Sequence, residues 1–421
     1  MAKLHHIRQL AVKTESTPGT AATGHAAADL IRVRELSIEQ NAQYFERPIH
    51  TTSWGYTPRR QENSWCEISF AVEIAGDTRN SSSWTAAPVW SRLLQACGME
   101  EIELYETGDS NGTATAVVKH GEQIADDHTT PTEAATVVGT WDIGSTRVYH
   151  RAMSTGTNFT ALSTITGEWG AADIDVMALP NGDDRVGYAW APDTDSTTTV
   201  TLEFRQDNEA GTADRIIVYG ARGDFTIDCQ SQDIAVIRFT LQGIYSATDV
   251  SGGLLDEYAA TAYREAIPPT FVDASLSLTD MSGGTDDWAA TNINFTNAQF
   301  TMGNNVVMRQ NSNSTSGWLA AHIAQRTPNG SFNPDDPGAG TFDLRDLFAA
   351  ETRWLLDMTW GTATYNTFRI QMPYIELDSV GDSERDEVQS FDLSFRATRG
   401  FDAGENANTV GRDNEFVLFY L

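Results

Sequence analysis

The alternation of apolar and polar residues is strictest in the middle of the chain, at 215–247. Apolar side chains occupy every second position over 225–229 and again over 237–241. A two-residue period places one face of a strand on a core and the other face towards solvent or a partner. The polar link at 230–233 then predicts the turn of an antiparallel hairpin.

The same pattern returns near the C-terminus. Apolar residues alternate over 368–374 and, after an acidic loop at 378–387, over 391–397. The two strands of the first hairpin are separated along the chain by almost the same number of residues as the two strands of the second. The two separations differ by only two residues. The sequence therefore predicts one β-unit that is used twice.

Each of these units also carries the signal of one short helix. The first helix is predicted after Pro88 and ends near Cys97, with an apolar stripe and with Gly98 at a left-handed cap position. The second is predicted around 344–352, with Asp343 as its N-cap. The repeated order is strand, long loop, strand, short helix and hairpin.

This order predicts a mainly β fold of two tandem β-sandwich or half-barrel domains, each with one short flanking helix. A segment rich in Thr, Gly and Ala matches neither repeat, so we expect it to be an inserted β-rich module. The predicted boundaries are 1–28 for an extended N-terminal arm, 29–104 with 188–250 for the first domain, 105–187 for the inserted module, 251–270 for a linker and 271–421 for the second domain.

The chain is strongly acidic, with 58 Asp and Glu residues against 28 Lys and Arg and a formal net charge of −30. Tight binding to DNA requires clustered cations, so this balance argues against it. The three cysteines are an odd number on apolar faces, which favours buried thiols over a disulfide scaffold. The sequence shows no secretory signal and no apolar run of membrane-spanning length, so we expect synthesis and assembly in a cytoplasm without a membrane partner.

Motifs that would indicate catalysis or a cofactor are missing from the sequence. It has no phosphate-binding loop, no dinucleotide glycine fingerprint and no nucleophile elbow. His120, Asp126, Asp127 and His128 lie close enough in sequence to bind a metal, although a solvated loop also explains them and is favoured. We therefore expect no catalytic residues, no metal and no cofactor.

Four stretches carry a family resemblance: AVKTESTPGTAAT at 11–23, APVWSRLLQACG at 87–98, VYGARGDFTIDCQSQDIAVIRFTLQGIYSA at 218–247 and RDNEFVLFYL at 412–421. The chain resembles the major tail tube proteins of long-tailed, siphovirus-type bacteriophages over 10–97 and 197–421. The resemblance implies a β-sandwich tube domain with a flanking helix. It also implies that sheets of neighbouring subunits join edge to edge into stacked rings through which DNA passes.

The resemblance implies a role in the virion tail and a set of partners. Tube domains of this family form six-fold rings, so a chain with two such domains would form the same ring as a homotrimer. The other expected partners are tail proteins such as the tape measure, tail terminator and distal tail proteins. Genomic DNA would pass through the tube without specific binding.

The resemblance also gives two groups of residues a role. A polar, net acidic channel lining would repel phosphates and let DNA slide. Long loops of this kind are often binding elements, and arginine suits pairing with carboxylates on a neighbouring ring. The expected lumen-facing positions are Asp224, Asp228, Arg238, Arg369, Gln371, Asp392, Ser394 and Arg396. The expected inter-ring positions, within the long polar segment at 39–63, are Arg47, Trp54, Arg59 and Arg60.

A binding function is the main alternative. A receptor-binding or tail-decorating β-protein would use the inserted module to contact the host surface, and would not need two equivalent ring-forming units. An acidic β-rich hydrolase is a weaker alternative, because no catalytic motif supports it. The repeat therefore favours a structural subunit.

Overall fold

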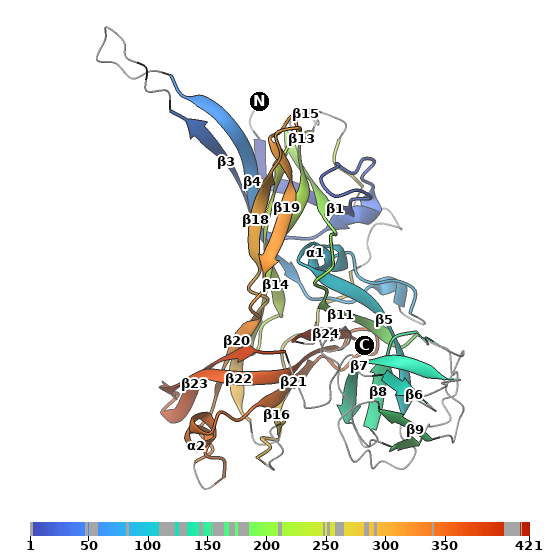
Figure 1. Ribbon diagram of the computed structural model, residues 1–421, viewed down its shortest axis with the longest axis vertical. Coiled ribbons are helices and arrows are strands. Elements are labelled where there is room, and N and C mark those ends of the chain that lie inside the picture. The colour runs from blue at the N-terminus through green and yellow to red at the C-terminus, as the bar shows by residue number, and fades with distance from the viewer. Residues whose placement is uncertain are drawn as a thin grey trace.

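The protein is mainly β, with a few short helices (Figure 1). The computed structural model describes residues 3–46, 49, 58–80, 84–108, 123–125, 133–142, 146–152, 154, 164–167, 173–175, 185–208, 213–246, 249–250, 253–256, 265–281, 286–289, 293–338, 341–399, 413 and 415–421. No helix within these ranges is long and apolar enough to cross a membrane.

One order of antiparallel strands occurs twice in the structure. In the first copy the order is β1 (Lys3–Thr14), β12 (Val200–Asn208), β13 (Ala213–Gln230), β14 (Val236–Tyr245), β4 (Arg60–Glu73) and β3 (Arg34–Phe45). In the second copy it is β16 (Ser275–Asp280), β21 (Trp354–Trp360), β22 (Phe368–Arg385), β23 (Val388–Ala397), β20 (Asn329–Pro334) and β17 (Phe295–Thr301).

The two copies also share their helices. α1 (Ser91–Ala96) follows β4 and α2 (Leu344–Ala349) follows β20. Both predicted helices are confirmed, because Leu93 and Leu94 of α1 are fully buried and the Asp343 side chain caps α2 by accepting a hydrogen bond from the Asp346 amide at 3.2 Å. Gly98 follows α1 with a φ of 82°, as its cap position predicts.

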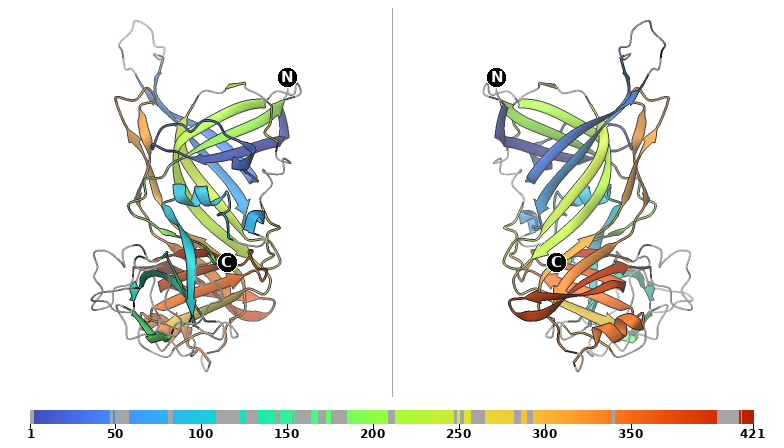
Figure 2. Two further views of the ribbon diagram at one scale, coloured as in Figure 1. Left: turned by 90° about the vertical axis from the view of Figure 1, so that its right-hand side faces the viewer. Right: turned by 90° about the vertical axis from the view of Figure 1, so that its left-hand side faces the viewer.

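A single long strand joins the two copies into one sheet. The first half of β13 pairs with β12, whereas residues 226–230 at its other end pair with β17 of the second copy. β14 runs along the opposite side of β13. Figure 2 shows the long green and yellow-green strands of the first copy continuing into the orange and red strands of the second. The hairpin of β18 (Asn305–Gln310) and β19 (Trp318–Gln325) extends the β17–β20 hairpin across β13.

The C-terminal strand completes a second layer behind this sheet. β24 (Val417–Tyr420) pairs on one side with β22 and on the other with β11 (Gly187–Pro192), which in turn pairs with β5 (Met99–Gly108). The ring of Phe416, just before β24, lies 6.0 Å from that of Phe225 on β13, so the main core fills the space between the layers. The apolar C-terminus, which would promote aggregation if it were unpaired, is covered on both edges.

The described part of the inserted module lies on the far side of the second layer. It contains β6 (Gln123–Ala125), β7 (Ala134–Asp142), β8 (Thr146–His150), β9 (Thr164–Gly167) and β10 (Asp173–Asp175), and β8 pairs with the end of β5. Tyr149 packs at 6.0 Å from Phe419, in a small second core with Ile102 and Leu104. The module thus packs on the face of the second layer that points away from the main core.

Four further short elements complete the fold. They are the strands β2 (Leu30–Ile31) and β15 (Asp249–Val250) and the 3-10 turns at Ala27–Asp29 and Thr78–Asn80. Cys66, Cys97 and Cys229 are free and buried, as their apolar positions predict.

The structure differs from the sequence prediction at three places. The predicted arm at 1–28 contributes β1, whose Leu10 and Val12 are fully buried at a spacing of two. Both ends of the predicted loop at 39–63 are strand, because β3 extends to Phe45 and β4 begins at Arg60. The predicted acidic loop at 378–387 is also mostly strand, and β22 turns into β23 through two residues of positive φ, a geometry that suits a tight hairpin.

His150 at the end of β8 gives a pH-dependent prediction for the module. Burial lowers the pKa of His150 from 6.5 to about 4, so protonation favours the unfolded state. Its contribution is present above about pH 6.5 and is lost as pH falls towards 4, by about 3 kcal/mol in total. We expect the melting temperature of His150→Gln to fall less between pH 7.5 and 4.5 than that of the native chain. An equal fall in both proteins would contradict this.

Candidate functional site

The candidate site is the polar face of the sheet that spans both copies. One transverse row of this face runs through five neighbouring strands, namely Asp228, Gln299, Ser331, Ser394 and Ser379 on β13, β17, β20, β23 and β22. The Gln299 amide donates to Asp228 at 2.7 Å, and the Ser379 and Ser394 hydroxyls lie 2.6 Å apart. The apolar residues that alternate with this row face the main core, so the two sides of the sheet are chemically distinct.

The charged groups on this face are arranged in pairs with an acidic excess. Arg238 donates to Asp228 at 2.6 Å and also pairs with Glu35, while Arg396 lies 3.2 Å from Asp378. Further carboxylates on this face are Glu67 of β4, Asp224 of β13 and Asp392 of β23. Both arginines are therefore neutralised by neighbouring carboxylates, which leaves few positive charges for a polyanion to bind.

Asp224 differs from the other carboxylates of the face because it is mostly covered. Burial raises its pKa, against the opposing effect of hydrogen bonds from the Asn304 amide at 3.0 Å and from Thr301. These partners come from the second copy, so Asp224 helps to hold the two copies together.

Six of the eight positions predicted for the channel lining share this face, namely Asp224, Asp228, Arg238, Asp392, Ser394 and Arg396. Arg369 and Gln371 do not, because they lie in the first half of β22, which belongs to the second layer. Both are buried, and the guanidinium of Arg369 donates to Asp357 at 2.7 Å and lies 5.9 Å from the ring centre of Phe419.

The error at Arg369 and Gln371 has a physical cause in the register of β22. Bulges insert one extra residue between Met372 and Ile375 and another between Leu377 and Ser379. The two extra residues together restore the phase of the alternation, but each bulge bends the strand. The first half of β22 therefore runs into the second layer, although apolar and polar residues continue to alternate along the sequence.

Two edges of this sheet are unpaired among the described residues. β3 pairs only with β4, and the part of β22 after Ile375 pairs only with β23. An unpaired edge offers a row of backbone N–H and C=O groups to another strand. Because one edge belongs to each copy, a second chain could bring its β3 alongside β22.

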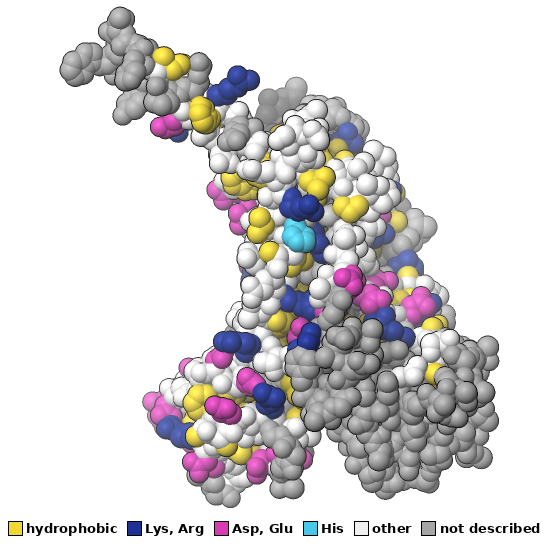
Figure 3. All heavy atoms as spheres, viewed as in Figure 1, with side chains coloured by type: hydrophobic (Ala, Val, Ile, Leu, Met, Phe, Trp, Pro, Cys, Tyr) yellow, Lys and Arg dark blue, Asp and Glu magenta, His cyan; other side chains and the backbone are white. Residues whose placement is uncertain are grey.

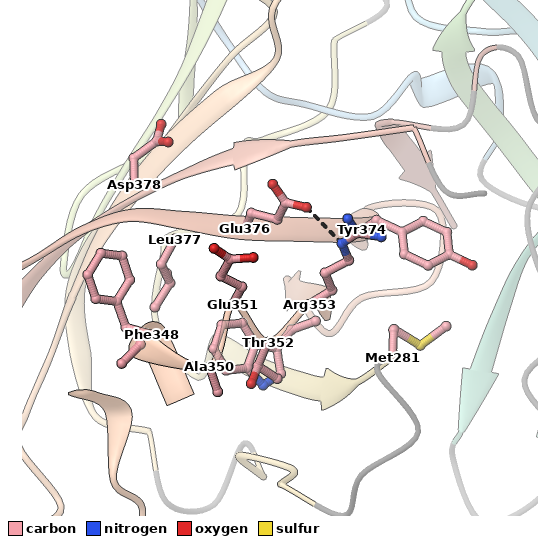
Figure 4. A pocket seen from close by; sticks show the side chains of 12 residues that line it. Met281, Phe348, Ala350, Glu351, Thr352, Arg353, Tyr374, Glu376, Leu377 and Asp378 are labelled. Carbon is pink, nitrogen blue, oxygen red and sulfur yellow. Dashed lines mark hydrogen bonds and ion pairs between the residues drawn. The ribbon is translucent and has the colours of Figure 1, made fainter. Parts of the chain in front are cut away.

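A cleft of about 820 Å³ lies next to the unpaired edge of β22. It is lined by the end of α2, the start of β21 and the middle of β22. The Arg353 guanidinium donates a hydrogen bond to Glu376 at 2.7 Å, drawn as a dashed line in Figure 4. Glu351 also borders the cleft, with a φ of 55° directly after the helix. Aromatic and aliphatic side chains, including Phe348 and Leu377, provide the apolar part of the lining.

The projecting β3–β4 hairpin is the other conspicuous surface. Tyr44 and Phe45, at the end of β3, are 53% and 61% exposed, and Arg59 lies just before β4, which begins with Arg60. Figure 3 shows hydrophobic and basic side chains on this projecting part of the molecule. Arg59 makes an exposed ion pair with Glu46, at 3.6 Å. The other two predicted contact residues, Arg47 and Trp54, lie outside the described residues.

The sequence did not indicate the cleft or the two open edges, and it provides no local signal for either. No group of three or more His, Cys, Asp or Glu in the described ranges is placed to bind a metal, and His120, Asp126, Asp127 and His128 lie outside those ranges. Comparison with protein-family models and with curated proteins gives no match to this chain.

Proposed function

We propose that this chain is the structural subunit of a bacteriophage tail tube, which assembles into stacked rings and conducts DNA without catalysing a reaction. The observation that supports this best is the β13–β17 junction. It shows that two copies of the same unit already join edge to edge, with one polar face continuous across both. Repeating that junction between chains would extend the sheet and close it into a ring, which removes every lateral edge.

The chemistry of the polar face fits a channel that DNA passes without binding. Its hydroxyl and amide groups are uncharged, and its arginines are paired with carboxylates. Phosphate binding needs unpaired cations, so the excess of Asp and Glu favours repulsion and sliding. The inserted module lies beyond the main core, and in a ring it would face outward and leave the channel clear.

The proposed partners follow from this assembly. The main one is the chain itself, in homotrimeric rings with two equivalent units per chain. Tape measure, tail terminator and distal tail proteins would contact the channel or the ends of the tube, and the assembled tube would belong to the virion tail.

Electron microscopy of the purified chain, together with its mass in solution, tests this function. We expect rings or tubes whose projections show six similar lobes, and a mass that rises in steps of three chains. A chain that stays monomeric at high concentration while its module binds host cells would instead support a receptor-binding or decorating protein.

A further inference from the structure

The junction inside the chain also specifies how two chains meet. We propose that the cleft beside α2 receives the β3–β4 hairpin of a second copy, and that β3 of that copy pairs antiparallel with the second half of β22. This inference rests on the proposed function, because it assigns the lateral contact of the same ring.

The first copy shows how such a hairpin is held. β17 pairs with 226–230 of β13, and the β18–β19 extension continues over the end of α1. There the Asn304 side chain donates to the Cys97 carbonyl at 2.7 Å and to the Gly223 carbonyl at 3.0 Å. At the far end of the hairpin, the Trp318 indole donates to the Ser64 carbonyl at 3.1 Å.

In the second copy the corresponding surface lies at the end of α2 and along β22, and no hairpin of the described residues covers it. Gly98 and Glu351 each follow their helix with positive φ, and Arg222 and Glu376 each follow the first bulge of the long strand. In the first copy, Ile323 of β19 approaches to 3.1 Å of where a side chain on Gly98 would begin. In the second copy, the same position borders the open cleft.

The β3–β4 hairpin is the part of the first copy that would fit this surface, and within the described residues its free edge pairs with no other strand. It corresponds to the β17–β20 hairpin, because β4 pairs with β14 as β20 pairs with β23. Leu36 and Ile38 on β3 are only partly covered, whereas Ala298 and Phe300 on the corresponding β17 are buried. Pairing with a second chain would bury this apolar face of β3.

The charges of the two parts are complementary. The cleft carries Glu351, Glu376 and Asp378; Arg353 pairs with Glu376 and Arg396 with Asp378, so the cleft keeps a net negative charge beside Glu351. The hairpin brings Arg59 and Arg60, next to the exposed rings of Tyr44 and Phe45. Arginine beside carboxylates and an aromatic anchor in a cleft is a common basis of protein interfaces. These arginines would then contact a neighbour in the same ring, and not in the next ring as the sequence suggested.

The internal junction gives the register on the β22 side. Asp228 of β13 pairs with Gln299 of β17 and, on its other side, with Val236 of β14. In the second copy Ser383 pairs with Ser390 of β23, and this pair takes the place of Asp228 and Val236. The residue of the incoming strand that takes the place of Gln299 should therefore lie opposite Ser383.

The register on the β3 side follows in the same way. Gln299 pairs with Ser331 of β20, and Ser37 pairs with Ser69 of β4. Ser331 and Ser69 occupy equivalent places, since they pair with Ser394 of β23 and Thr240 of β14. The proposed interface thus places Ser37 of one chain directly opposite Ser383 of its neighbour.

Cross-linking of cysteine variants tests this register. Chains that carry Ser37→Cys and Ser383→Cys are assembled and treated with a short bis-maleimide, because opposite residues of paired strands lie about 5 Å apart. The native thiols are buried, and burial raises the pKa of Cys66 to about 11, so their background reaction is low. We expect covalent dimers and trimers from the double variant and none from Ser37→Cys combined with Thr362→Cys. Asp228→Cys with Gln299→Cys is the positive control, linked within one chain.

A second pair of variants tests the hairpin and the cleft. Tyr44→Asp with Phe45→Asp should raise the concentration needed for assembly by at least about tenfold, because the loss of one anchor at an interface typically costs that much. Val307→Asp with Leu319→Asp is the matched control, since these apolar residues are exposed on the internal hairpin, and it should assemble normally.

The outcomes separate this inference from the proposed function. If tubes form but the Ser37 and Ser383 variants do not cross-link, the inferred interface is wrong and the tube function still stands. The same holds if the Tyr44 and Phe45 variant assembles normally. A folded chain that forms neither tubes nor cross-links would overturn both.

Discussion

A chain that ends at residue 414 is expected to fail to fold. Phe416 and the four residues of β24 are at most 2% exposed, and β24 is hydrogen-bonded on both edges. Full burial of one large apolar side chain contributes about 1.5–3 kcal/mol, so these five contribute roughly 7–15 kcal/mol as an upper estimate. That equals the whole net stability of a typical domain, about 5–15 kcal/mol.

Soluble yield and thermal unfolding followed by circular dichroism measure this effect. Leu421→Ser is the control, because Leu421 is partly exposed and its backbone bonds to Thr367 are kept. The control should melt within a few degrees of the native chain. A truncated chain that remains soluble and melts cooperatively at the native temperature would show that β24 is not needed to close the core.

Two lysines on the polar face are expected to make the proposed tube retain DNA. Thr240→Lys and Ser331→Lys place one cation on β14 and one on β20, so the two copies of the unit each gain one. Repetition around the ring and along the stack would align many cations with the phosphate backbone. A protein that makes six to ten phosphate contacts loses affinity for DNA roughly 10³–10⁵-fold when salt rises from about 50 to 200 mM.

Retention is measured by assembling tubes with a short fluorescent duplex and sedimenting them at both salt concentrations. We expect the lysine variant to retain DNA at low salt only and the native tube to retain none. The control adds the same charge elsewhere, with Ala152→Lys and Ser154→Lys on the module, where both residues are exposed. Equal retention by both variants would mean that DNA binds the outside of the tube.

The sequence predicted the features that depend on local chemistry. Trp90, Leu93 and Leu94 have helical spacing, Asp343 has a side chain that can cap a helix, and Gly98 suits a left-handed residue. The hairpins also followed from alternation, because one buried face imposes a period of two. The mainly β fold and both short helices were therefore within reach of the sequence.

The remaining features depend on contacts between distant segments. The N-terminal strand was not predicted, because its buried face is short and it carries Arg8 and Lys13. The acidic residues around Asp382 suggested a loop, but the chain continues there as an edge strand. Arg369 was misplaced because the alternation does not show where bulges bend β22 into the second layer. The open edges became visible only when the pairing of the two copies could be compared.

The covalent link between the two copies has a kinetic consequence. In a ring of three chains, every second lateral junction is the β13–β17 junction, which forms as each chain folds. Its two partners are tethered, so they meet at an effective concentration of millimolar order however dilute the chain is. Nucleation of a ring would then depend on the third power of chain concentration at most, where six separate domains would need the sixth. In the proposed tube, a tethered pair would therefore start assembly at a lower protein concentration than separate domains would need.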